Sequence, residues 1–306
     1  MLPAAEPLPP ASPDLAPPER SLGLSVRRWS RTVPARQWAR EAAELEALGE
    51  ALPRVLTESR PLAEVHRLDL GLFVVFEDAA LRVSGALVRR APTEAALRFA
   101  AQQTLDEAHH HEVFRARLDL AQDNAGLPPG RGEEAILTPP LRRFIDRCYE
   151  VADAGSFIEG LTLVNLVLEG MAYPLYAYEE RYWRAIDPYL SRLVRGAFTD
   201  ETRHVTFGAR LVDELLRGDV ERRGRVARLC EEARRTLAEI FAYYVRAFVG
   251  LFDAVARRHP GLFGDAEFAP GRRIADTPYE EQVAAIHRSI DVEHRRLLGS
   301  AGLLLG

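Results

Sequence analysis

Two five-residue stretches, DEAHH at 106–110 and DETRH at 200–204, decide how this sequence is interpreted. Each has the pattern Asp-Glu-x-x-His. On a helix, positions three apart lie about 60° apart around the axis and one turn along it, so the Glu and the His of each motif share a face. Each stretch therefore predicts a helix that presents a carboxylate and an imidazole in the same direction.

A further carboxylate stands upstream of each motif, inside an apolar run. Glu77 ends the run GLFVVFE at 71–77, and Glu169 ends the run LTLVNLVLE at 161–169. Runs that are apolar all round predict central helices. An ionised carboxylate buried alone costs several kcal/mol, so each of the two needs an Arg partner, a raised pKa or a metal ion.

The order helix-Glu, then helix-Glu-x-x-His, occurs twice. Glu77 precedes Glu107 by 30 residues, and Glu169 precedes Glu201 by 32. Such spacing suits one helix that runs up and a neighbour that returns, with both side chains at the same height. Four helices then bring four Glu and two His to one point, the ligand set of carboxylate-bridged di-iron or di-manganese bundles. The predicted metal ligands are Glu77, Glu107, His110, Glu169, Glu201 and His204.

The charge and the donor atoms of this set favour two metal ions. Four carboxylates balance two divalent cations, and oxygen and nitrogen ligands suit iron or manganese. We expect two iron ions, with a Mn/Fe pair as the other option. In the first motif, spacing leaves His111 open as the ligand, but His110 is preferred because it matches His204.

An outer layer of charged residues can also be predicted. A metal-bound His usually donates its other ring N–H to a carboxylate. Asp106 and Asp200 each precede a predicted ligand, and we expect each to reach across to the His of the other motif. Arg203 is expected to tie the two Asp residues together.

Other candidates are assigned structural roles. Glu159 stands ten residues before Glu169, about 15 Å along a helix, and His66 stands eleven before Glu77, so both are too far away to be ligands. His294 lies in polar surroundings and is expected at the surface.

The remaining pattern is helical almost throughout, with no period-2 alternation to suggest strands. This predicts an all-α chain, a helical bundle with additional flanking helices. Residues 1–34 read as a disordered Pro/Ala-rich tail and residues 35–306 as a single domain, with the metal-site core at about 62–218 and C-terminal helices at about 220–306. The predicted helices are 35–56, 62–90, 93–124, 141–183, 188–218, 220–259 and 279–298.

The composition excludes several classes of function. The net charge is -5, so no basic footprint for nucleic acid or anionic lipid stands out. No Lys occurs in the sequence, which excludes Schiff-base and Walker-type lysines. No apolar stretch is long enough for a membrane span. Two cysteines cannot form a disulfide framework, and a cytoplasmic location is expected.

At these residues the sequence resembles the ferritin-like non-haem di-iron carboxylate oxygenase superfamily. Nearest in kind are p-aminobenzoate N-oxygenase-like and bacterial hydroxylase members. Three departures from the sequence patterns of these families narrow the choice of subfamily. Phe114 stands where a tyrosyl-radical reductase subunit has its tyrosine, Tyr173 where several hydroxylases have Thr, and Ala197 where the N-oxygenases add a His.

The resemblance implies an O2-dependent oxygenase that inserts oxygen into a small, fairly apolar or aromatic substrate, by N-oxygenation or C–H hydroxylation, as a biosynthetic tailoring enzyme. It also implies a ferredoxin or reductase as electron donor, and it leaves a homodimer open. The alternative is a ferroxidase- or peroxidase-type iron protein without an organic substrate.

Two further expectations concern the surroundings of the metals. Tyr173, one turn after Glu169, is expected to face the interior, either as a hydrogen-bonding or redox-active group or simply as a core aromatic, and Pro174 is expected to kink the helix and open a substrate path. Expected pocket walls are Phe73, Phe76, Leu105, Phe114, Leu166 and Tyr173.

Overall fold

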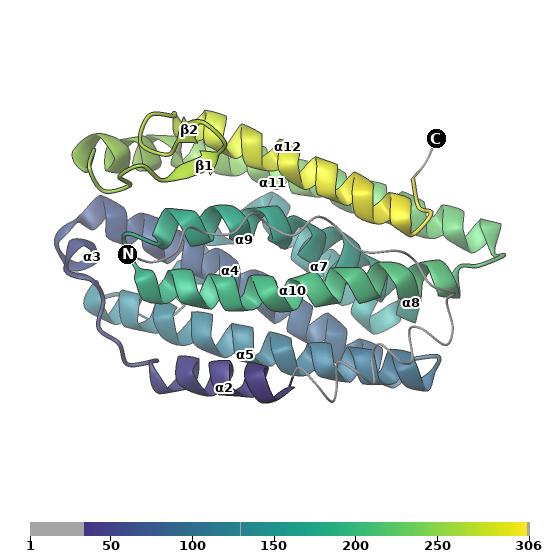
Figure 1. The fold of residues 1–306 in the computed structure, drawn as a ribbon. Coiled ribbons are helices and arrows are strands. Elements are labelled where there is room, and N and C mark those ends of the chain that lie inside the picture. Colours follow the sequence, from purple (N-terminus) through teal and green to yellow (C-terminus); the bar gives the residue numbers. More distant parts are fainter. Residues whose placement is uncertain (1–33, 129, 305–306) are drawn as a thin grey trace.

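The computed structural model describes residues 34–128 and 130–304. Long helices run side by side along one direction (Figure 1). The helices and strands are α2 (Pro34–Glu46), α3 (Arg54–Glu58), α4 (Arg60–Arg90), α5 (Glu94–Asn124), α6 (Arg131–Ile136), α7 (Pro139–Ala154), α8 (Phe157–Leu161), the π-helical segment η1 (Thr162–Leu168), α9 (Glu169–Trp183), α10 (Pro188–Leu215), α11 (Val220–Arg258), β1 (Glu267–Ala269), β2 (Arg272–Arg273) and α12 (Tyr279–Ser300).

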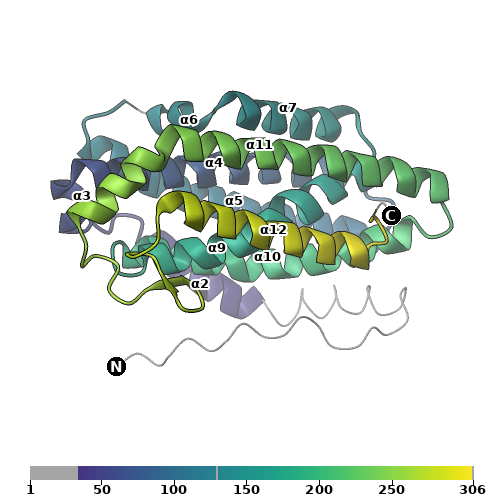
Figure 2. The ribbon, with the colours of Figure 1, turned by 90° about the horizontal axis from the view of Figure 1, so that it is seen from above.

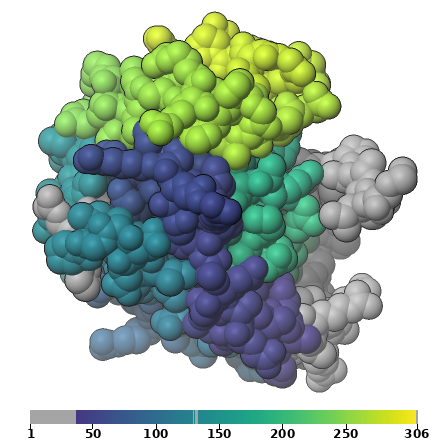
Figure 3. Space-filling view, turned by 90° about the vertical axis from the view of Figure 1, so that its left-hand side faces the viewer, coloured from purple at the N-terminus to yellow at the C-terminus, as the bar shows by residue number. Residues whose placement is uncertain are grey.

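The predicted helical bundle is confirmed. α4 packs along α5, and α9 packs along α10, which gives the two antiparallel pairs expected from the repeated motif order. α11 and α12 form a layer over these pairs, and α7 flanks α4 and α11 (Figure 2). In Figure 3 this C-terminal layer lies at the top and α2 at the opposite side. None of the described helices has the length and apolar character needed to cross a membrane.

Local sequence signals explain where the central helices begin and end. Thr93 caps α5, where its hydroxyl oxygen accepts a hydrogen bond from the backbone N–H of Ala96 at 3.2 Å. α4 ends with Arg89 and Arg90 in its last turn, just before Pro92. Basic side chains at that end interact favourably with the helix dipole.

Several predicted boundaries are wrong. The predicted helix 35–56 is two helices, because α2 ends at Glu46 and Pro53 starts α3. The predicted loop after α5 contains the short helix α6. A small antiparallel hairpin, β1 with β2, lies in a segment where no strand was expected, and it turns at Gly271 with φ of 70°.

The largest difference concerns the predicted helix 141–183. It breaks at Gly155, and a new helix begins at Ser156, which forms a capping box with Glu159. The role of Glu159 is therefore to start a helix, in agreement with its exclusion as a ligand. The predicted tail falls outside the described residues except for Pro34, the first residue of α2.

The second irregularity in this region is π-helical. Residues of η1 run directly into Glu169, whose backbone N–H donates to the carbonyl oxygen of Val164, five residues earlier. The α-helical assignment of α9 continues through Pro174. The distortion next to this predicted ligand thus lies before Glu169 rather than at Pro174, where it was expected, and π-helical turns occur frequently at functional sites.

Candidate dimetal site

Four helices place the six predicted ligands in the centre of the bundle. Glu77 comes from α4, Glu107 and His110 from α5, Glu169 from α9, and Glu201 and His204 from α10. Each of these side chains is at most 2% exposed. Of the three adjacent histidines, His110 belongs to the group. Their service as metal ligands remains a prediction, but the structure brings all six together.

The six side chains form two overlapping groups of four. One group consists of Glu77, Glu107, His110 and Glu201, and the other of Glu107, Glu169, Glu201 and His204. Within each group, one potential ligand atom of every residue lies within 4.8 Å of the others. Since Glu107 and Glu201 occur in both groups, this arrangement suits two metal ions bridged by two carboxylates.

Both histidines turn Nδ1 toward the glutamates of the site and Nε2 toward an aspartate outside it. Nδ1 of His110 is 3.5 Å from Glu107, while its Nε2 is 3.1 Å from Oδ2 of Asp200. Nδ1 of His204 is 3.1 Å from Glu107, while its Nε2 is 3.1 Å from Oδ2 of Asp106. The crossed Asp–His contacts are those expected from the sequence, and they direct Nδ1 of each imidazole at the predicted metal position.

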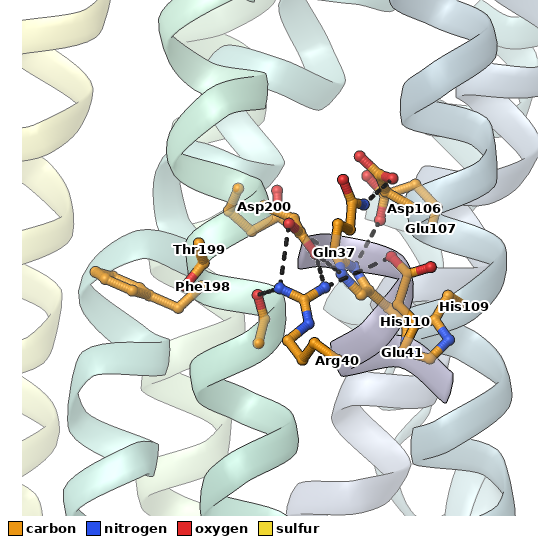
Figure 4. Close-up of polar contacts among 12 residues, drawn as sticks. Gln37, Arg40, Glu41, Asp106, Glu107, His109, His110, Phe198, Thr199 and Asp200 are labelled. Carbon is orange, nitrogen blue, oxygen red and sulfur yellow. Dashed lines mark hydrogen bonds and ion pairs between the residues drawn. The ribbon is translucent and has the colours of Figure 1, made fainter. Parts of the chain in front are cut away.

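The outer charges are held by a helix that the sequence analysis did not connect to the site. Arg203 contacts Asp200 and lies 3.8 Å from Asp106, as expected. From α2, Gln37 donates to Asp106 at 2.6 Å, and Arg40 donates to Asp200 at 2.5 Å (Figure 4). Gln37 and Arg40 stand three residues apart and so share one face of α2. This spacing is the one feature of the sequence that links them.

Glu169 is held by two amide side chains. Gln103 donates to its Oε1 at 2.5 Å, and Asn165, in the π-helical segment, donates to its Oε2 at 2.9 Å. The Asn165 amide also donates to Oε1 of Gln103 at 3.2 Å. Both oxygens of Glu169 are thus engaged by donors, which fixes the orientation of this carboxylate.

The tyrosine beside the site is Tyr176, and the expectation for Tyr173 is wrong. The hydroxyl of Tyr176 donates to Oε1 of Glu77, and its ring lies edge-on to Phe73 at 5.4 Å. Tyr173 is only half-buried, and its ring packs on Phe198 at 4.6 Å. Leu105 was also expected to line a pocket beside the metals. That prediction is wrong, because Leu105 is 53% exposed.

The charges of the site are not balanced by the protein alone. Burial and the neighbouring carboxylates, opposed by His110, raise the pKa of Glu77 to about 8. Burial and the charge of Glu201 raise the pKa of Glu169 well above its usual range. Burial acts in the same direction on Glu107, but the nearby imidazoles of His110 and His204 prevail and hold the pKa of this carboxyl well below its usual range.

Unpaired buried atoms test whether metal ions fit this group. Both carboxylate oxygens of Glu107 and Nδ1 of His110 are buried and form no hydrogen bond with any part of the chain that the structure describes. A buried polar atom without a partner is costly. These three atoms lie in the overlapping groups, so divalent ions would satisfy them, and the donor set fits both Fe/Fe and Mn/Fe.

The other histidines have structural contacts. Nε2 of His66 is 2.9 Å from Asp187, a carboxylate that also binds Arg117. His109 contacts Glu44 of α2 at 2.8 Å. The prediction that His294 is exposed is wrong: it is 2% exposed, and its Nε2–H donates to the carbonyl oxygen of Val167 at 2.8 Å.

A glycine of α10 sets the distance to the π-helical segment. A methyl group at Gly208 would lie 2.5 Å from Cβ of Asn165. We expect Gly208→Ala to displace Asn165 from Glu169 and to lower the free energy of unfolding by about 1–3 kcal/mol, because overpacked contacts must shift. Urea unfolding measures this free energy.

Gly250→Ala is the control, since nothing lies within 4 Å of that position in α11. This substitution is expected to stabilise the protein by roughly 0.5–1 kcal/mol. Equal unfolding midpoints for the two variants would contradict the argument.

Comparisons with known proteins agree with this arrangement at the level of the fold. A scan against protein-family models and a search of curated proteins both find no match. Among solved structures, an R2-like ligand-binding oxidase with an aerobically reconstituted Mn/Fe cofactor is similar, at 16% identity and a TM-score of 0.50. The match covers 88% of this chain and 93% of that chain. A tyrosine-to-phenylalanine mutant of an R2-like ligand-binding oxidase, also with a Mn/Fe cofactor, aligns at 17% identity and a TM-score of 0.46, over 90% and 92% of the two chains. This chain therefore has the ferritin-like helical fold of that oxidase, and its buried carboxylate and histidine groups lie at the centre of that fold.

Proposed function

We propose that this protein is a di-metal oxidoreductase that uses dioxygen to insert one oxygen atom into a small organic substrate. The observation that carries the proposal is the pair of buried four-residue groups that share Glu107 and Glu201. These residues would hold a pair of redox-active ions, which would supply the binding and reduction of dioxygen. Iron in both positions is the preferred loading, and Mn/Fe is the other loading that this donor set accepts.

The protein's own part is to hold the ligands and to keep water out. Asp106 and Asp200 accept the Nε2–H of the two histidines, so each Nδ1 is turned toward the glutamates, where a metal ion would take the place of a proton. On the α4 side, the rings of Phe73 and Phe114 stack at 4.8 Å, and both are buried. Buried aromatic rings next to the predicted ligands support an apolar or aromatic substrate over a charged one.

Electron balance requires a second protein or a small reductant. Insertion of one oxygen atom from O2 takes two electrons and two protons from outside, and the other oxygen leaves as water. The oxidation of substrate alone does not supply this pair. A ferredoxin or a flavin reductase is therefore the proposed partner of the chain.

The decisive experiment follows labelled oxygen. The iron-loaded protein is reduced anaerobically and exposed to 18O2 with a panel of small aromatic amines and alkylbenzenes. We expect a product that contains one 18O atom, and none with the metal-free protein. If iron is oxidised and oxygen is consumed while no member of the panel gains label, the protein behaves as a ferroxidase instead, and the oxygenase proposal is overturned.

A further inference from the structure

A second buried site lies beneath the C-terminal helices, and none of the six predicted ligands lines it. It is a cavity of about 50 Å³ between α4, α9, α11 and α12. Leu72, Phe76, Leu175 and Phe241 are among its apolar walls. A space of this size holds on the order of three or four water molecules, or a charged head group with a short carbon chain.

Two carboxyl groups face this apolar space. Asp69, which is half-buried, comes from α4, and Glu179, 7% exposed, comes from α9. The indole N–H of Trp183 donates to Glu179 at 3.0 Å and also interacts with Asp69. Burial raises the pKa of Asp69 to about 8, and burial together with the charge of Asp69 raises the pKa of Glu179 well above its usual range.

The absence of a cation distinguishes this pair from other buried carboxylates of the chain. Asp187 is paired with Arg117 and His66, and Asp200 with Arg40. Asp69 and Glu179 form no ion pair with an Arg or a His in the parts of the chain that are described. A buried carboxylate requires a proton, a partner or a bound cation.

An unpaired hydroxyl and several aromatic rings complete the cavity. The hydroxyl oxygen of Tyr244 is buried and has no hydrogen-bond partner among the described residues, although the side chain lines the cavity. Tyr178, by contrast, donates to Gln282 at 2.9 Å. The ring of Tyr279, which also lines the cavity, stacks on Phe252. Electron-rich ring faces attract ammonium ions, most strongly when both are desolvated.

We propose that this cavity binds a small organic ammonium ion. Its N–H groups would donate hydrogen bonds to Asp69, Glu179 and the hydroxyl oxygen of Tyr244. Its carbon chain would lie against Leu72 and Phe76. An ammonium ion binds as these carboxyls release protons to the solvent, whereas a neutral alcohol of the same length leaves an ionised carboxyl without a counter-charge, and a carboxylate of that length is repelled by it. The site therefore selects by charge rather than by size.

Three probes of equal length test this selectivity on the metal-loaded wild-type protein: n-propylammonium, 1-propanol and propionate. Binding is measured by saturation-transfer NMR and calorimetry at about pH 9, above the pKa of about 8 of Asp69 and below that of the ammonium probe. We expect propylammonium to bind roughly tenfold or more tightly than 1-propanol, and propionate to bind weakest. Equal affinities for the three probes, or no binding of propylammonium, would overturn the proposal without bearing on the metal site.

Isosteric variants locate the binding. Asp69→Asn and Glu179→Gln are each expected to remove the preference for propylammonium over 1-propanol. Asp78→Asn is the matched control, because Asp78 lies on the same helix but pairs with Arg82 outside the cavity, and it should keep the preference. If both cavity variants retain the preference, the ammonium ion binds elsewhere and the assignment fails. Metal content, measured in parallel, shows that the bundle is intact.

Discussion

Replacing Glu107 with alanine is expected to weaken metal binding at least about a hundredfold, because this side chain belongs to both four-residue groups. Its two oxygens are buried and unpaired within the described structure, so they are available to both ions. His204→Ala removes a ligand from only one group, and it is expected to lose most of the bound metal as well. Metal analysis of the purified proteins, with circular dichroism as a measure of helix content, tests both expectations.

The control for this experiment is on the same helix. Glu112 is exposed, so Glu112→Ala should leave two ions per chain and the same helix content. Metal loss accompanied by loss of helix would indicate unfolding rather than the loss of a ligand. Two ions retained by both Glu107→Ala and His204→Ala would show that the ligand assignment is wrong.

The metal-free protein is expected to become less stable as the pH rises from about 6 to about 9. The pKa of Glu77 is raised from 4.5 to about 8 in the folded chain, so the native state binds a proton that the unfolded state has released. The stabilisation that this proton provides has its full value below pH 4.5, the ordinary pKa of a glutamate. It is lost as the pH rises through about 8, the pKa of Glu77 in the folded chain. His110 and His204 act in the same direction: burial lowers their pKa, but the surrounding carboxylates raise it well above the usual value.

Groups with lowered pKa values act in another pH range. For Asp200, burial is outweighed by hydrogen bonds from His110 and by nearby arginines, and its pKa lies well below the usual range. Its contribution is lost only in acid, as the pH falls below the ordinary carboxyl value. It therefore does not offset the loss of stability above pH 6.

Thermal unfolding with and without chelator measures how the stability of the metal-free protein depends on pH. The midpoint of the chelated protein should fall by several degrees across this pH range, while that of the metal-loaded protein should change less, because ions replace the protons at Glu77, His110 and His204. A midpoint of the metal-free protein that is constant or rises with pH would contradict the charge description of the site.

The four central helices could be predicted because their signals are local. A Glu and a His three apart share a helix face whatever surrounds them, and a carboxylate inside an apolar run, such as Glu77, must find a partner in the core. The repetition of both features fixed the pairing of the helices. The crossed contacts of Asp106 and Asp200 followed from the ordinary chemistry of metal-bound imidazole.

The surrounding residues depended on geometry that local patterns do not contain. Tyr173 was predicted and Tyr176 was not, although on a helix the seventh residue after Glu169 is rotated by only about 20° from it, against about 40° for the fourth. Gln37 and Arg40 come from a helix separated from the motifs by more than sixty residues of sequence. Such tertiary contacts leave no mark in the periodicity of either segment.

The crossed Asp–His contacts make the two copies of the motif mutually dependent. Each imidazole is aimed by an aspartate that belongs to the opposite copy, so neither copy alone can present a finished set of donors. The two helix pairs must therefore dock before the donor set is complete, and a first ion held by Glu107 and Glu201 would fix both shared carboxylates for a second one. Loading with metal would thereby be coupled to assembly of the whole bundle, and a partly filled protein would be disfavoured relative to an empty or a full one.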